Sequence, residues 1–210
     1  MIAVDWVAVS SIVTAAATLV LAVATFASVR SANRAARVAE QSLLAGLRPL
    51  LVPSRLDDPP VKVGFADDKW FKIEGSGAVA EVDDGVVYLA ISVKNVGGGI
   101  AVLDGWHAGE LVTGGGDHQP LGEFRRLTRD IYVAPGDISF WQGALRDPED
   151  SLTQSVRQHI ERRERFVVEV LYADHAQGQR AITRFAITPR QGEGWFAAVS
   201  RHWNVDRPER

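Results

Sequence analysis

A run of 24 residues without a charge constrains this chain more than any other feature of its sequence. The run extends from Trp6 to Val29 and reads WVAVSSIVTAAATLVLAVATFASV. As a helix it rises about 36 Å, enough to cross a hydrocarbon core of about 30 Å with some tilt. All 23 basic residues and all but one of the 26 acidic residues follow it, the exception being Asp5. The run predicts a transmembrane helix over 6–29, preceded by a short N-terminal tail over 1–5.

Two other interpretations fit this apolar run less well. A secretory signal peptide, cut after the Ala22-Val23-Ala24 pattern, needs a basic segment before its apolar core. The first five residues contain no Lys or Arg. A buried helix of a soluble protein rarely stays free of charge for about six turns. Membrane insertion is therefore the favoured interpretation.

The charges that flank the span predict its orientation. Arg30, Arg34 and Arg37 follow the span, whereas only the amino group and Asp5 precede it. Because basic residues close to a span stay on the cytoplasmic side, we expect the N-terminus outside the cell membrane and residues 30–210 in the cytoplasm. The same guanidinium groups can contact the headgroups of anionic membrane lipids.

Small side chains form a stripe within the span. Ser10, Thr14, Thr18 and Ala22 recur every four residues, a spacing that lets two helix backbones approach closely and self-associate. Ala, Ser and Thr are frequent throughout the run, so a stripe of this kind also arises by chance. Helix association through these four residues is one interpretation, and background composition is the other.

Residues 30–48 have helical composition and contain no helix breaker before Gly46. They predict a juxtamembrane helix that continues the membrane helix as a stalk. Apolar residues recur with alternating spacings of three and four, which also allows two such stalks to pair. Pro49 ends the helical pattern, because the residue before a proline is pushed toward extended backbone.

After Pro49 the hydrophobic pattern changes to alternation typical of strands. In VVYLAISVKN (86–95) apolar residues occupy every second position, and turn-forming sequences such as APGD separate similar stretches. We therefore predict an antiparallel immunoglobulin-like β-sandwich over 49–190, without the disulfide of antibody domains because the chain has no Cys. The other strand candidates are 49–53, 61–65, 69–73, 99–111, 129–133, 138–142, 165–173 and 180–188.

One helix is expected inside this mainly β domain. Asp147 is a candidate N-cap and Pro148 suits the first helical position. Leu152, Val156 and Ile160 follow at helical spacing and would form the inward face.

The C-terminal segment 191–210 is rich in aromatic residues. Trp195, Phe196, Val199 and Trp203 have helical spacing, which predicts a short terminal helix that covers an open edge of the sandwich. The alternative is that these four residues form a partner-binding face, since exposed Trp beside Arg is typical of binding hot spots.

The sequence offers no recognisable catalytic or cofactor site. The absence of Cys excludes a thiolate metal site and a Cys nucleophile. The Gly triplets at 97–99 and 114–116 lack the context of a phosphate loop, and the paired Asp residues suit turns. We therefore expect no cofactor and no enzymatic activity, and with a net charge of −3 no nucleic-acid partner. The five His residues are scattered without ligand spacing: His107, His118, His159, His175 and His202.

Several elements together resemble a known kind of protein. They are the NVGGGIA run (95–101), the RPL tripeptide (48–50), APGD (134–137) and a tyrosine element over 172–185 that ends in TRF. They are similar to uncharacterised bacterial single-pass membrane proteins of actinobacterial type, from GC-rich genomes, and 19 Arg against four Lys fit such a genome. The resemblance implies an N-terminal transmembrane helix and a C-terminal immunoglobulin-like β-sandwich, and it carries no catalytic residue.

Two classes of function follow from these features. The first is a membrane-anchored binding or scaffold protein whose cytoplasmic sandwich contacts a protein partner or a second copy of the chain. The second is a surface-exposed or secreted binding module, if the topology is reversed or the first segment is a signal peptide. An enzyme with an unrecognised site is a distant third.

Overall fold

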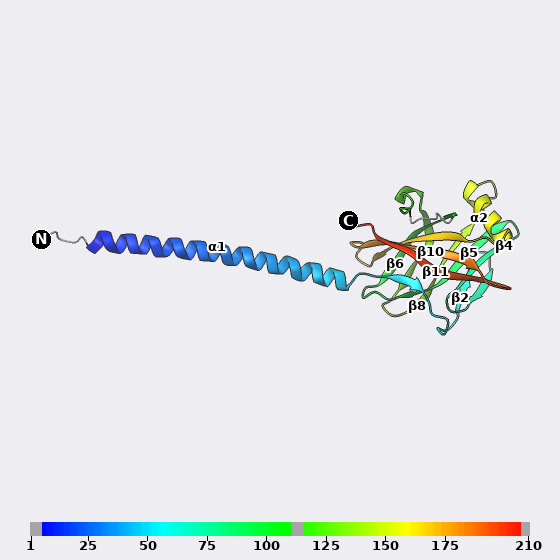
Figure 1. The fold of residues 1–210 in the computed structure, drawn as a ribbon, viewed down its shortest axis with the longest axis horizontal. Helices are drawn as coiled ribbons and strands as arrows, with labels where there is room; N and C mark the ends of the chain where they lie inside the picture. The colour runs from blue at the N-terminus through cyan, green and yellow to red at the C-terminus, as the bar shows by residue number, and fades with distance from the viewer. Residues whose placement is uncertain (1–5, 111–115, 207–210) are drawn as a thin grey trace. The chain divides into compact units, whose positions relative to one another are not determined.

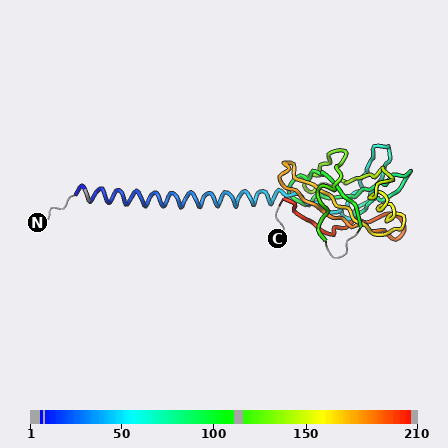
Figure 2. The backbone as a smooth tube through the Cα atoms, turned by 90° about the horizontal axis from the view of Figure 1, so that it is seen from above, coloured from blue at the N-terminus to red at the C-terminus, as the bar shows by residue number. Residues whose placement is uncertain are grey.

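The computed structural model describes residues 6–110 and 116–206, and it divides into two compact units, Met1–Ala45 and Gly46–Arg210 (Figure 1). The first unit is a single helix, α1 (Trp6–Gly46), which Figure 2 shows as one uninterrupted coil. The predicted membrane segment and the predicted stalk are therefore one continuous helix. No turn interrupts this helix, because no Pro or Gly occurs before Gly46.

The described side chains of α1 are exposed along its length. Among the described residues it is the one helix long and apolar enough to cross a membrane, by length and composition. Two hydroxyl groups in its apolar segment are satisfied within the helix, because Thr14 and Thr18 donate to the carbonyls of Ser10 and Thr14, each at 2.8 Å. Internal pairing of this kind removes the cost of placing a hydroxyl in an apolar surrounding.

The second unit is mainly β and contains one α-helix in its described part, α2 (Ser151–Glu161), and one short 3₁₀ turn, Leu121–Glu123. Each strand candidate named from the sequence coincides with an observed strand, and two observed strands, β4 and β11, were not expected as strands. The strands are β1 (Leu51–Pro53), β2 (Val61–Gly64), β3 (Trp70–Ile73), β4 (Gly77–Asp83), β5 (Val86–Asn95), β6 (Ala101–Glu110), β7 (Arg125–Val133), β8 (Ile138–Leu145), β9 (Phe166–Asp174), β10 (Arg180–Pro189) and β11 (Trp195–Asn204).

Nine of these strands form one antiparallel sheet, and β2 and β3 form a separate hairpin. The order in the large sheet is β1-β5-β4-β11-β10-β9-β6-β7, with β8 also paired to β5. The sheet curls so that Trp106 of β6 and Trp141 of β8, at opposite sides of the strand order, lie 5.3 Å apart between ring centroids. The immunoglobulin-like sandwich of two sheets is not confirmed; the domain is a curled antiparallel sheet.

The inside of the curl holds the main hydrophobic core. Trp141, Tyr172, Phe166 and Phe185 are among its largest fully buried side chains. The β2–β3 hairpin covers the other face of β5, where Tyr88 packs with apolar residues of the hairpin. Strand β5 is therefore buried on both faces for most of its length.

Helix α2 begins three residues later than the expected cap. Its N-cap is Asp150, whose carboxylate accepts a hydrogen bond from the Thr153 backbone N–H. Asp147 instead accepts from the backbone N–H of Glu149 and shapes the turn before the helix. The expected inward face is confirmed, because Val156 is buried in the core. Leu152 and Ile160 pack against it.

The C-terminal aromatic segment is a strand, so the expected terminal helix was wrong. Gly192 and Gly194 have positive φ and form the turn that returns β11 antiparallel along β10. Pairing with β10, and at Trp195 and Phe196 also with β4, satisfies backbone groups that a helix would have bonded internally. Tertiary pairing therefore overrides the helical spacing of the aromatic residues.

The Gly triplet at 97–99 has a specific packing role. A Cβ on any of these glycines would lie within 3.0 Å of a backbone oxygen of the segment 46–48, where the chain leaves α1. Asn95 holds the adjoining turn, because its side-chain amide donates to the carbonyls of Gly99 and Val133. The NVGGG run is therefore a seat for the segment that joins the helix to the β-domain.

Candidate functional site

The four aromatic-segment residues do not form one exposed face. Trp195 and Trp203 are 5% and 9% exposed, whereas Phe196 and Val199 are 38% and 42% exposed. A bulge opposite Arg184 and Phe185 shifts the register of β11, which moves later side chains to the other face of the sheet. Trp195 consequently packs with Phe166 in the main core, whereas Trp203 packs on the outer face.

The helix residues named from the sequence lie on two exposed faces of α1. Ser10, Thr14, Thr18 and Ala22 lie together on one exposed face of α1. Arg30, Arg34 and Arg37 lie together farther along the helix, beside Phe26 and Val29. The geometry thus places three cations immediately after the apolar segment.

Within the described part of the β-domain, a hollow lies at the opening between β7 and β8. These strands are joined by the turn 134–137, but they do not pair: β7 pairs with β6 and β8 pairs with β5. We define the β7–β8 seam by residues 125–130 and 142–146. It contains a hollow of about 240 Å³, bordered by both strands, by Trp106 and by Phe65 and Ala66 of the segment after β2.

Strand β7 itself departs from regular pairing along this seam. Arg126 lies opposite Gly105 of β6, and Ile131 lies opposite Leu103. The four residues 127–130 of β7 therefore lie opposite a single residue of β6, Asp104. Bulges of this kind redirect side chains and are common beside functional sites. Arg129 reaches across the seam, where its Nη2 donates to Oε1 of Gln142 at 3.1 Å and its guanidinium lies over Phe140.

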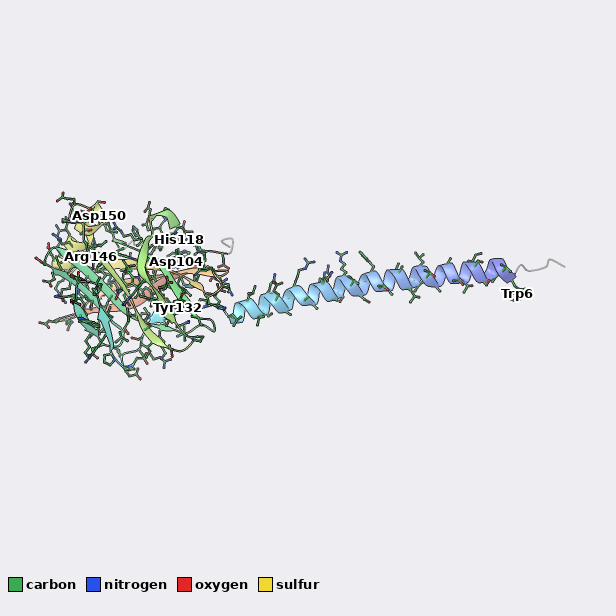
Figure 3. All side chains as sticks on the ribbon, turned by 180° about the vertical axis from the view of Figure 1, so that it is seen from behind. Trp6, Asp104, His118, Tyr132, Arg146 and Asp150 are labelled. Carbon is green, nitrogen blue, oxygen red and sulfur yellow. The ribbon has the colours of Figure 1, made fainter. Side chains whose placement is uncertain are left out.

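The seam is rich in arginine. Arg125, Arg126 and Arg146 line the hollow, in addition to the crossing Arg129. Arg125 and Arg146 each have one carboxylate partner, Asp150 at 2.7 Å and Asp67 at 3.2 Å. Figure 3 labels Arg146 and Asp150 at this part of the β-domain.

Two pKa shifts mark the rim of the seam. The hydroxyl of Tyr88 donates to Asp67 at 2.6 Å, which lowers the pKa of Asp67 and raises the pKa of Tyr88. Burial raises the pKa of Asp150, but hydrogen bonds from Thr153 and the charge of Arg125 outweigh it and leave that pKa below its ordinary value. Both carboxylates are therefore held in their charged form beside the seam arginines.

A buried ion pair on the outer face of the sheet was missed by the sequence reasoning. Arg184 Nη2 and Glu169 Oε1 lie 2.6 Å apart, with side chains 5% and 2% exposed. Glu169 also accepts from the backbone N–H of Gln119, and Arg184 donates to the carbonyls of Gly116 and Asp117. The pair clamps the segment 116–119 onto the sheet. The sequence signal for this ion pair is a charged residue in the middle of a strongly apolar strand, Glu169 in β9 and Arg184 in β10.

A second buried polar cluster lies at the start of the β-domain. The hydroxyl of Tyr172 is 2.9 Å from Thr183 Oγ1 and accepts from the backbone N–H of Leu51. Burial raises the pKa of Tyr172, and it lowers the pKa of His202, whose ring lies 3.2 Å from the same Thr183 oxygen. These groups pair with one another and fix β1, so the cluster has a structural role.

In residues 6–110 and 116–206, the histidines form no metal-binding cluster: no group of three or more His, Asp or Glu residues there could hold a metal ion. His118 packs edge-on against Trp203. The carboxylate of Asp174 accepts from the backbone N–H groups of Gly178 and Gln179 within the hairpin turn. Gly114 and Gly115 of the second triplet lie outside the described residues, as do the N-terminal tail 1–5 and residues 207–210.

Comparison with known proteins gives no relative from which to carry over a function. No family model matches the chain, and neither a curated protein nor a solved structure matches it.

Proposed function

We propose that this chain is a membrane-anchored, non-enzymatic binding or scaffold protein that presents its β-domain to a protein partner at the cytoplasmic face of the cell membrane. The observation that carries the proposal is the exposed apolar face of α1 all around the segment 6–29, followed at once by Arg30, Arg34 and Arg37. An apolar helix of this length is stable in a bilayer and costly to expose to water. The three cations favour retention of the following residues in the cytoplasm.

The form of the β-domain supports a binding role. Two strands border an open seam without pairing across it, and four arginines surround that opening. Free strand edges and convergent cations are recognition features for a partner chain. The small-residue stripe of α1 adds a route to self-association within the membrane.

Membrane anchoring and orientation can be tested with introduced cysteines, because the chain has no Cys of its own and each introduced thiol is labelled alone. A single Cys replaces Gly122, which is exposed and has open space where a side chain would extend. A second variant carries Ala3→Cys in the N-terminal tail. Intact cells that express each variant are treated with a membrane-impermeant maleimide, and membrane and soluble fractions are then separated.

We expect both variants in the membrane fraction, resistant to alkaline washing and released by detergent. Gly122→Cys should be labelled only after lysis, whereas Ala3→Cys should be labelled in intact cells. Recovery in the soluble fraction would overturn the anchor. The reverse labelling pattern would overturn the cytoplasmic placement and favour a binding module on the outer surface.

A matched charge variant tests the orientation argument. Replacement of Arg30, Arg34 and Arg37 by Gln should leave the chain in the membrane and produce a mixed population of orientations. Replacement of Arg162, Arg163 and Arg165 by Gln removes the same charge far along the sequence and should leave the orientation unchanged, since only charges near the span determine it. Equal labelling of the two triple variants would refute the role of the juxtamembrane arginines.

A further inference from the structure

We propose that the β7–β8 seam binds an acidic peptide segment in extended conformation, which adds to the free edge of β8 as a further strand. The inference rests on the proposed function, because it names the class of partner that the β-domain would receive. It follows from the unpaired strand edges, the size of the opening and the charge around it.

The first argument is the unused hydrogen-bonding capacity of the two edges. An edge strand directs alternate backbone N–H and C=O groups away from its paired neighbour. Strand β8 pairs along its whole length with β5 and has no registered partner on its other side within the described chain. Residues 127–130 of β7 likewise lie outside the register on β6. A peptide backbone can satisfy such groups, whereas a simple anion cannot satisfy a row of donors and acceptors.

The second argument is the shape of the opening. The strands necessarily approach at their shared turn, 134–137, and the hollow lies toward their other ends, beside Arg125 and Arg146. Its volume of about 240 Å³ is below the range of roughly 300–1,000 Å³ typical of pockets for small-molecule ligands. A hollow of this size receives one or two side chains of a bound segment at the open end, and the rest of that segment would lie along the edge of β8.

The third argument is charge complementarity. Four guanidinium groups surround the seam. Within the described part of the chain, two of them have a carboxylate at ion-pair distance, Asp150 for Arg125 and Asp67 for Arg146. The residues that define the seam comprise four arginines and one acidic residue, Asp130, so the seam is locally cationic although the whole chain carries a net charge of −3. Guanidinium groups bind carboxylates through paired, charge-assisted hydrogen bonds. Acidic side chains on alternate residues of an added strand would meet these groups.

The probe is a fluorescein-labelled peptide of seven alternating Thr and Glu residues, titrated by anisotropy into the full-length chain in neutral detergent. Three comparison peptides are used: one with Lys in place of Glu, one with the same composition but N-methylated on alternate backbone amides, and one unlabelled competitor. We expect saturable binding of the Glu peptide and a loss of its affinity at high salt. The Lys peptide and the N-methylated peptide should each bind about tenfold or more weakly than the Glu peptide.

Two variants locate the binding. Arg126→Glu alters an exposed seam residue and should weaken binding about tenfold or more. Arg55→Glu makes the same charge change at an exposed residue that does not border the hollow, and it should bind the peptide as the unmodified chain does. Circular dichroism of both variants checks that the β-domain is folded, which is expected because both side chains are exposed.

Each outcome decides a part of the proposal. Equal binding of the Glu and Lys peptides overturns the charge argument, and equal binding of the N-methylated peptide overturns strand addition. Equal weakening by the two Arg variants places binding outside the seam. No binding of any peptide refutes the inference without bearing on the membrane anchor, which the fractionation and labelling experiment tests separately.

Discussion

Replacement of Glu169 by Leu should cost about 3–5 kcal/mol of folding free energy, because it leaves the guanidinium of Arg184 buried without its carboxylate. The two side chains are 5% and 2% exposed, and the substitution also removes the acceptor of the Gln119 backbone N–H. Loss of one partner from a buried ion pair typically costs about this amount. With an m-value of about 2 kcal/mol per molar urea, the unfolding midpoint should fall by about 2 M.

The single variant Arg184→Met and the double variant Glu169→Leu, Arg184→Met complete a cycle that separates the net contribution of the ion pair from the cost of breaking it. Because two apolar side chains leave no buried charge, the double variant should be more stable than Glu169→Leu alone, with a coupling energy of at least about 2 kcal/mol. The measurement is urea unfolding of the full-length chain in mild detergent, followed by tryptophan fluorescence. Trp203 lies 4.8 Å from the Arg184 guanidinium and reports on the site directly.

The matched control is Glu74→Gln, which removes the exposed ion pair with Lys72. It should change stability by less than about 0.5 kcal/mol. The reasoning is refuted if Glu169→Leu behaves like this control, or if the effects of the two buried substitutions simply add.

Two further changes test the glycine seat and the helix cap. Gly98→Ala should destabilise the β-domain by about 1–3 kcal/mol in thermal unfolding, because its Cβ would collide with the carbonyl of Gly46. The same change should speed proteolysis near residue 47. Gly122→Ala places its Cβ in open space and should have neither effect. Asp150→Ala should cost about 1 kcal/mol at pH 7 by removing the cap of α2. The pKa of Asp150 is lower in the folded protein than its ordinary value of 3.8. The stability that its charged carboxylate contributes is therefore present above pH 3.8 and is lost as the pH falls through the lower, folded value. The unmodified protein and Asp150→Ala should consequently converge in stability toward low pH. A constant difference from pH 7 to pH 2 would contradict the role of the charged carboxylate.

The sequence by itself determined the long helix and most of the strands. A charge-free run of 24 residues has few alternatives to a membrane-length helix, and no breaker occurs before Gly46, so one helix continues through Arg30–Arg37. Alternation at 86–95 identified β5, because a pleated strand places every second side chain on the same face. These features are local, and local pattern is enough to find them.

The tertiary structure decided how the strands are joined and where the aromatic residues lie. Trp195, Phe196, Val199 and Trp203 have helical spacing, yet pairing with β10 makes a strand of them, and one bulge separates the two Trp side chains onto opposite faces. The sequence likewise does not predict the β7–β8 seam. Strands β7 and β8 are consecutive and joined by a short turn, which suggests a hairpin, but each pairs with another strand. Strand partners depend on long-range hydrogen bonds and on burial across the whole sheet, and neither quantity is encoded in the spacing of neighbouring residues.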